Sequence, residues 1–256
     1  MFILALLSLW LPIAAPIYLI GRDPNSVTIL TMGLMFGVFL YLVRVWGRKV
    51  YRQPGLLKKY GLQLTAQNAL ELIRGLGLGL LMTLSLFGLQ GWLGWLAFQT
   101  PPLSWSRLIV EGLISALAIG FAEELVFRGW LLDELQRDYS FRTSQWIGAI
   151  AFALLHFLKP IPEMIRSLPR FPSLLLLGLI LIWAKRYTQG RLGLSIGFHA
   201  GLVWGYYIID VGQLVLYSGK VAPWITGINR DPTAGIMGLL FLALVAWWMK
   251  RNYYSD

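Results

Sequence analysis

The feature that most constrains this chain is a series of long apolar runs separated by short basic loops. A helix of about 20 apolar residues crosses the hydrocarbon core of a bilayer. Hydrophobic residues make up 57% of the 256 positions, charged residues only 13%, and the mean hydropathy is +0.64. These values are typical of a polytopic membrane protein. The sequence therefore predicts an all-α integral membrane protein that spans the membrane several times.

About eight runs are candidate transmembrane helices, which divides the chain into an N-terminal helix pair with a basic cytoplasmic loop (1–74) and a six-helix core (75–256). The loop, Arg44 to Arg74, is the longest hydrophilic segment, and a surface-lying helix is expected after Thr65. Prolines between 160 and 172 exclude one continuous helix there. The runs are Phe2 to Ile20, Val27 to Val43, Gly75 to Phe98, Leu108 to about Leu135, Trp146 to Leu158, Ser173 to Ala184, Leu194 to Leu216 and Ala234 to Met249.

The basic residues predict the orientation. Placing the Arg44 to Arg74 loop in the cytoplasm puts 15 of the 22 lysines and arginines on that side and predicts that both termini are cytoplasmic. The net charge of +10 is explained by these loops, so a nucleic-acid partner is not expected and membrane lipid is. There are no cysteines, which excludes disulfides, thiol nucleophiles and thiolate metal sites.

Two adjacent carboxylates and a cation interrupt the fourth run. Glu123, Glu124 and Arg128 lie in a segment otherwise apolar enough to cross the membrane. Charged groups at such depth cost at least about 2.5 to 3.5 kcal/mol and normally carry function. Glu124 and Arg128 are four residues apart, with the acid first, which favours an ion pair on a helix. Glu123 lies about 100° round the helix and is left without that partner. The pattern predicts one structural carboxylate and one that is free to act.

Both histidines of the chain, His156 and His199, also fall inside apolar runs. We expect them to reach a depth similar to that of Glu123, in the cytoplasmic half of the membrane. A carboxylate beside an imidazole can deprotonate a water for attack on a carbonyl, while a second imidazole donates to the oxyanion. The same three side chains could instead bind a catalytic zinc. The sequence leaves open whether no cofactor or one divalent metal is needed.

The motifs resemble those of the CPBP family of intramembrane proteases, which includes the type II CAAX prenyl endopeptidases and the bacteriocin-processing or Abi proteins. The resemblance covers roughly Leu108 to Tyr207 and lies in three motifs on successive spans: Glu123-Glu124-x-x-x-Arg128, Phe152-x-x-x-His156, and His199. It implies an endopeptidase, glutamate-type or metal-dependent, that cuts a membrane-attached peptide or protein near the cytoplasmic face. Glu123 and His156 would activate the water, His199 would help to stabilise the oxyanion, and Glu124 and Arg128 would support the site.

The third motif departs from the family at Val203, where Asn or Asp is usual four residues after the histidine. An aliphatic side chain can neither donate to an oxyanion nor bind a metal. Losing one oxyanion donor typically costs about 10² to 10³ in rate. Tyr206 and Asp210 follow on the same helix and are candidates to line the same cavity.

Two other functions remain open on the sequence. The first is a non-proteolytic member of the family that binds a partner protein, a lipid or a pigment as an assembly or regulatory factor. Trp204 to Tyr207 and Trp224 to Gly227 are similar to cyanobacterial and chloroplast members, so the host membrane is expected to be a bacterial inner membrane or a thylakoid. The second is a transporter or proton relay, since chains of acids and histidines also mark ion paths.

Overall fold

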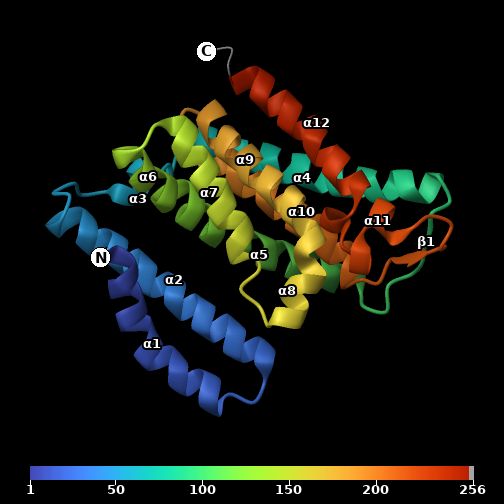
Figure 1. Ribbon diagram of the computed structural model, residues 1–256, viewed down its shortest axis with the longest axis horizontal. Coiled ribbons are helices and arrows are strands. Elements are labelled where there is room, and N and C mark those ends of the chain that lie inside the picture. Colours follow the sequence, from blue (N-terminus) through green and yellow to red (C-terminus); the bar gives the residue numbers. More distant parts are fainter. Residues whose placement is uncertain (254–256) are drawn as a thin grey trace. The chain divides into compact units, whose positions relative to one another are not determined.

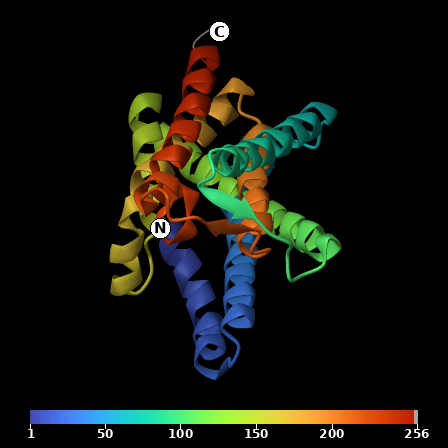
Figure 2. The same cartoon turned by 90° about the vertical axis from the view of Figure 1, so that its right-hand side faces the viewer.

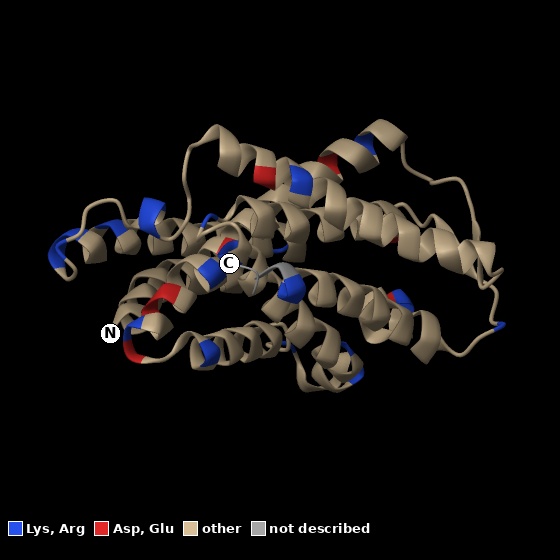
Figure 3. Ribbon diagram, turned by 90° about the horizontal axis from the view of Figure 1, so that it is seen from above, with Lys and Arg blue, Asp and Glu red and all other residues tan. Residues whose placement is uncertain are grey.

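The computed structural model describes residues 1–253 and divides into two compact units, 1–59 and 60–256 (Figure 1). The domain boundary expected after residue 74 falls within a helix that belongs to the second unit. Helices account for nearly all regular structure, which confirms the all-α prediction. Most of the ribbon carries no charged residue (Figure 3).

The first unit is a helical hairpin. Its helices are α1 (Phe2–Ile20), α2 (Pro24–Lys49) and the single turn α3 (Leu56–Lys59). Asp23 caps α2 by accepting a hydrogen bond from the backbone N–H of Ser26 at 2.8 Å. Only two residues of α1 are buried, and its outward side chains are apolar, as lipid-facing residues are.

The second unit packs α4 (Ala66–Trp92), α5 (Trp105–Glu124), α7 (Phe141–Leu155), α9 (Phe171–Tyr187), α10 (Gly193–Asp210) and α12 (Ile236–Tyr253). The π-helix η1 (Leu125–Leu131) and α6 (Leu132–Asp138) continue α5 without a break. Short helices lie between the long ones: α8 (Ile161–Ser167), η2 (Leu168–Arg170), α11 (Pro223–Thr226), η3 (Ile228–Arg230) and η4 (Pro232–Ala234). Strands β1 (Leu96–Phe98) and β2 (Val215–Tyr217) pair antiparallel (Figure 2).

Four described helical segments are long and apolar enough to cross a membrane: Phe2–Ile20, Pro24–Lys49, Ala66–Trp92 and Ile161–Tyr187. The last joins α8, η2 and α9 without a break, so the expectation that the prolines between 160 and 172 interrupt the helix was wrong. The predicted count of eight is therefore not confirmed, although the membrane character is. Part of the reason is length. At 1.5 Å per residue, the 15 residues of α7 extend about 22 Å, less than the hydrocarbon core, which is about 30 Å thick.

Three predicted boundaries were wrong. The Thr65 hydroxyl caps α4 by accepting from the N–H of Asn68, so the expected surface helix and the third span form one helix of 27 residues. That helix ends at Trp92, and Phe98 lies in β1. The seventh span ends at Asp210, because the chain then turns into β2. Neither strand has the length or alternation that marks a strand in a sequence.

Glycines bring α4 and α10 into direct backbone contact. A Cβ added at Gly197 would lie 2.0 Å from the carbonyl oxygen of Leu72, and one added at Gly79 would lie 2.4 Å from that of Phe198. Small residues at such spacing let helices approach closely where no hydrophobic effect drives them together. This contact fixes α10, which carries His199, against α4.

Polar contacts also hold the start of α10 to the start of α4. Asn68 accepts a hydrogen bond from the N–H of Gly193, the first residue of α10, at 2.7 Å. Arg191 donates to both carboxylate oxygens of Glu71 through Nε, at 3.1 and 3.0 Å, and through Nη2 at 2.6 Å. Hydrogen bonding to Glu71 raises the pKa of Arg191 above its usual range. The start of α10 is therefore anchored before the helix reaches the site.

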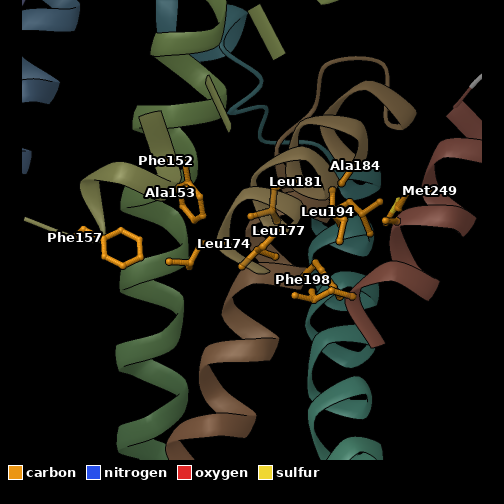
Figure 4. Packing of buried hydrophobic residues seen from close by; sticks show 13 residues of the cluster. Phe152, Ala153, Phe157, Leu174, Leu177, Leu181, Ala184, Leu194, Phe198 and Met249 are labelled. Carbon is orange, nitrogen blue, oxygen red and sulfur yellow. The ribbon is translucent and has the colours of Figure 1, made fainter. Parts of the chain in front are cut away.

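The main apolar core lies between α7, α9, α10 and α12 (Figure 4). Phe152, Leu181 and Phe198 are among its fully buried residues. Phe152 also lies at the centre of the candidate site, so its side chain belongs to both the apolar core and the site.

We expect Gly79→Ala to lower the free energy of unfolding by about 1 to 3 kcal/mol, because its methyl group meets the backbone of α10. Gly77→Ala is the matched control, since nothing lies within 4 Å of a Cβ at that position of the same helix. It should be neutral or stabilise slightly. Unfolding of the purified protein in mixed micelles measures both, and equal effects would show that the close approach of α4 and α10 is not a constraint.

Candidate active site

The segment with Glu123, Glu124 and Arg128 is helical throughout, but it changes type at the site. Glu124 ends α5 and Arg128 lies in the π-turn η1. π-turns are rare, and those inside α-helices are frequently found at functional sites. The Lys185 ammonium donates a 2.7 Å hydrogen bond to the carbonyl oxygen of Arg128, which provides that carbonyl with a partner outside its own helix.

Glu124 and Arg128 form a buried ion pair, as their spacing predicts. Arg128 Nη1 donates to Glu124 Oε1 at 2.8 Å, and the two side chains are 1% and 0% exposed. Arg128 Nη2 also donates to the carbonyl oxygen of Gly178, and its guanidinium carbon lies 4.1 Å from the centre of the Phe152 ring. A charge pair at this depth needs such additional partners to offset its desolvation.

The same oxygen of Glu124 also fixes His199. Its Oε1 lies 2.9 Å from His199 Nδ1. A carboxylate that is paired with an arginine only accepts hydrogen bonds, so the proton of the neutral imidazole lies on Nδ1 and the lone pair on Nε2. Glu124 therefore determines which nitrogen of His199 faces the remaining carboxylate.

His156 is held in the corresponding tautomer by a different acceptor. It is the C-cap of α7, and its Nδ1 lies 2.7 Å from the carbonyl oxygen of Phe152, one helical turn earlier. A carbonyl can only accept, so Nδ1 carries the proton and Nε2 presents a lone pair. Phe152 thus contributes its backbone to His156 and its ring to Arg128.

Glu123 lies between the two imidazoles. Its Oε2 is 3.8 Å from His156 Nε2 and 4.0 Å from His199 Nε2, and this buried oxygen has no hydrogen-bond partner among the described residues. These separations are too long for direct hydrogen bonds, and they suit one water that donates to the carboxylate and to an imidazole lone pair. The structure therefore brings Glu123, His156 and His199 together as predicted.

A cavity of about 170 Å³ adjoins this group. Val203 and Tyr206 line it, as does Phe152, whereas Asp210 is exposed at the end of α10 and lines neither described cavity. Most of the lining is apolar and comes from α4, α9, α10 and the start of α12. The cavity can thus take an apolar segment up to His156 and His199.

Polar residues that the sequence analysis missed line the same cavity. Arg170, Asp231 and Thr233 come from the segment before α9 and from the turn that begins η4. Arg170 Nε lies 2.7 Å from Asp231 Oδ2 and 3.2 Å from Thr233 Oγ1. These residues lie in connecting segments 61 or more positions apart, so no spacing pattern relates them.

The residues present do not form a metal site. Within the described part of the chain, no group of three or more His, Asp or Glu side chains is arranged to hold a metal ion. A catalytic zinc needs three protein ligands. Glu123, His156 and His199 are not arranged as such a set, so we derive no step through a metal.

Comparison with family models matches residues 104–205 to the family described as type II CAAX prenyl endopeptidase Rce1-like. This segment is similar to the Rce1-like family. It contains Glu123, His156 and His199 and ends just before Tyr206, so the resemblance seen in the motifs is confirmed for this segment. The match supports activity as an intramembrane protease of the CAAX type. Comparison with curated proteins and with solved structures found no match.

We expect Arg128→Met to lower the free energy of unfolding by about 3 to 5 kcal/mol, because it leaves the Glu124 carboxylate buried without its cation. Arg107→Met is the matched control, since Arg107 and Glu111 form a pair of the same spacing whose side chains are 60% and 49% exposed. Its effect should stay below about 1 kcal/mol. Similar losses in the two variants would mean that the Glu124–Arg128 pair is not the structural support of the Rce1-like segment.

Proposed function

We propose that the protein is an intramembrane endopeptidase that hydrolyses a peptide bond of a membrane-attached substrate with a water activated by Glu123. The observation that carries the proposal is the buried Oε2 of Glu123, flanked by the Nε2 atoms of His156 and His199 at 3.8 and 4.0 Å. A general base must lie within reach of the proton that it takes, directly or through one water. The Rce1-like match of residues 104–205 supports the same reaction class.

In this mechanism Glu123 Oε2 removes a proton from the water, whose oxygen attacks the peptide carbonyl. The His156 lone pair orients the same water, because its Nδ1 proton is tied to the Phe152 carbonyl. The tetrahedral intermediate collapses when the C–N bond breaks, and Glu123 returns its proton to the leaving amine. Proton transfer of this kind contributes about 10² to 10⁴ in rate.

In this mechanism His199 stabilises the oxyanion when its own imidazole ring is protonated. When it is neutral, Nε2 carries a lone pair and cannot donate, because Glu124 holds the Nδ1 proton. When His199 is protonated, both ring nitrogens donate. Glu124 Oε1 lies 2.9 Å from Nδ1, and Glu123 Oε2 lies 4.0 Å from Nε2. A metal ion has no part in these steps.

Val203 favours a second candidate, a family member that binds without cutting. It lines the cavity where the family usually has Asn or Asp, so the wall there is apolar. Such a cavity could hold a lipid, a pigment or a helix of a partner protein. Under this alternative Glu123 is not needed for function.

Glu123→Gln should reduce turnover by about 10² to 10⁴, because an amide has the size of the carboxylate but cannot act as a base. The fold should be retained, since Glu123 Oε2 has no hydrogen bond to lose within the described residues. Turnover is measured in proteoliposomes with a library of lipid-anchored peptides, and mass spectrometry identifies the released fragments. Glu111→Gln is the control, because Glu111 is an exposed glutamate on the same helix.

Equal fragment release by wild type and Glu123→Gln would contradict the protease assignment. A stoichiometric partner or lipid that co-purifies equally with both would then favour the binding alternative. The same assay after treatment with a chelator, with metal content measured on the sample, tests the mechanism: turnover should not change. Loss of turnover that zinc restores would contradict the metal-independent steps.

The membrane face of the cavity can be predicted from the connecting segments. Arg170 and Asp231 lie in segments that the lysine and arginine count places outside the cytoplasm, whereas the site was expected near the cytoplasmic face. The two expectations cannot both be true. We retain the orientation with cytoplasmic termini, because it rests on 15 of 22 basic residues. We therefore predict that the cavity faces the non-cytoplasmic side.

The chain has no cysteine, so single cysteines report on this directly. Lys220→Cys, in the exposed turn between α10 and α12, should react with an impermeant maleimide in intact cells. Gln189→Cys, in the exposed turn between α9 and α10, should react only after the membrane is opened. The reverse pattern would place the cavity on the cytoplasmic face and overturn the predicted location of the termini.

A further inference from the structure

Lys185, in the last turn of α9, has no part in the mechanism above but contacts the segment that supports the site. Its Nζ donates a 2.7 Å hydrogen bond to the backbone carbonyl oxygen of Arg128, in the π-turn η1. A lysine at this position of a helix commonly binds the last carbonyl groups of its own helix or extends into solvent. The bond of Lys185 instead joins two helices through residues 57 positions apart.

The π-turn explains why this carbonyl group takes a donor from another helix. In an α-helix, the N–H of Leu132 would donate to the carbonyl oxygen of Arg128, four residues earlier. Here it donates to the carbonyl oxygen of Phe127, five residues earlier. Arg128 is 1% exposed, and a buried carbonyl group without a partner costs about as much as a lost hydrogen bond. Lys185 therefore supplies the donor that the π-turn removes.

Helix α9 holds Arg128 at both its backbone and its guanidinium. Lys185 binds the carbonyl oxygen of Arg128, and the Nη2 group of Arg128 donates to the carbonyl oxygen of Gly178 at 3.3 Å. Gly178 and Lys185 are seven residues apart, so they lie on the same face of α9. A Cβ added at Gly178 would lie 3.0 Å from the Cα of Ala149, so α9 packs tightly against α7 at this point. One helix thus fixes the whole of Arg128.

The backbone that carries Lys185 is itself held in place. Its carbonyl oxygen accepts hydrogen bonds from the N–H of Gly190 at 2.9 Å and from the Thr188 hydroxyl at 3.0 Å. The carboxylates of Asp133 and Glu124 lie near enough to stabilise the charge of the ammonium. Lys185 therefore acts on η1 from a fixed point of α9.

Arg128 transmits this constraint to the site. Its Nη1 group donates to Glu124 Oε1 at 2.8 Å, and the same oxygen lies 2.9 Å from His199 Nδ1. A displacement of the π-turn would move the guanidinium away from Glu124, and Glu124 would then no longer be held against His199. A continuous series of contacts therefore runs from Lys185 through Arg128 and Glu124 to His199.

We propose that Lys185 is a positioning residue for hydrolysis. By stabilising the π-turn it keeps Arg128 on Glu124, and so keeps the proton of neutral His199 on Nδ1. This inference rests on the proposed proteolysis, in which His199 stands beside the oxyanion. Lys185 lines neither described cavity, so it acts through Arg128 and does not touch the substrate.

Lys185→Met removes the donor and keeps a long side chain. We expect kcat to fall about 10- to 100-fold, because a small displacement of a catalytic group has effects of this size. KM should stay within about threefold of the wild-type value, since no cavity-lining residue has changed. Both constants are measured in proteoliposomes with the lipid-anchored peptide that the wild type cuts fastest. Lys185→Arg, which keeps a charged N–H donor, should retain most of kcat.

Lys250→Met is the matched control. Lys250 is exposed, lies in the last turn of α12 and lines neither described cavity. Its loss removes the same charge from the same position of a helix, so any effect of the helix dipole is matched. Both kcat and KM should stay at the wild-type values.

The state of His199 can be measured without a substrate. The chain has two histidines, so ¹⁵N labelling of histidine gives two rings, and His156→Gln assigns them. In mildly alkaline buffer, His199 of the wild type should show one neutral tautomer with its proton on Nδ1. In Lys185→Met a second population with the proton on Nε2 should appear, and in Lys185→Arg and Lys250→Met it should not.

A folded Lys185→Met protein with wild-type kcat, or with only KM changed, would overturn the positioning role. So would His199 signals identical to those of the wild type. If Lys185→Met does not fold, Lys185→Arg decides: wild-type kcat and a single tautomer are expected, and a second tautomer in the folded variant would contradict the proposal. If the wild type cuts no peptide, the proposed proteolysis fails, and the tautomer measurement still tests whether Lys185 positions His199.

Discussion

The site depends on one oxygen atom, Oε1 of Glu124. It accepts from the Arg128 guanidinium at 2.8 Å and lies 2.9 Å from His199 Nδ1, in a part of the helix bundle where all three side chains are buried. In a medium of low dielectric an unpaired polar group is costly, so a network of this kind is stable only when its members are paired. Because Glu124 carries this role, Glu123 has no structural partner to satisfy and its Oε2 remains available.

The network works only if α10 is held in register with α5 and α4. Gly197 on α10 and Gly79 on α4 allow backbone contact, so a shift of the helix along its axis would drive carbonyl oxygens into neighbouring atoms. Gly120 on α5 faces Ala200 of α10 just beside His199. Close packing of small residues therefore holds α10 against its neighbours and fixes the distance between Glu124 and His199.

The sequence predicted the contacts that local spacing determines and failed where the partners are distant along the chain. The Glu124–Arg128 pair results from a separation of four residues on one helix. The motifs predicted that Glu123, His156 and His199 lie at a similar depth, and their side chains are within 4.0 Å of Glu123 Oε2. The bond between Glu124 and His199 joins residues 75 positions apart, so the tautomer of His199 could not be read from the chain. Arg170 and Asp231 lie in connecting segments without periodicity, and the cap at Thr65 merged two predicted helices into one.

Val203 shows how these constraints act on the chemistry. With an aliphatic side chain at that position, no polar group one turn beyond His199 can share the charge of an oxyanion. Under the proposed mechanism, stabilisation of the oxyanion then falls on His199 alone, which donates from Nε2 only as an imidazolium. Glu124 Oε1 lies 2.9 Å from Nδ1 of this imidazole, and Glu123 Oε2 lies 4.0 Å from Nε2. Oε1 of Glu124 thus links the buried ion pair with Arg128 to His199, the imidazole that the proposed mechanism places beside the oxyanion.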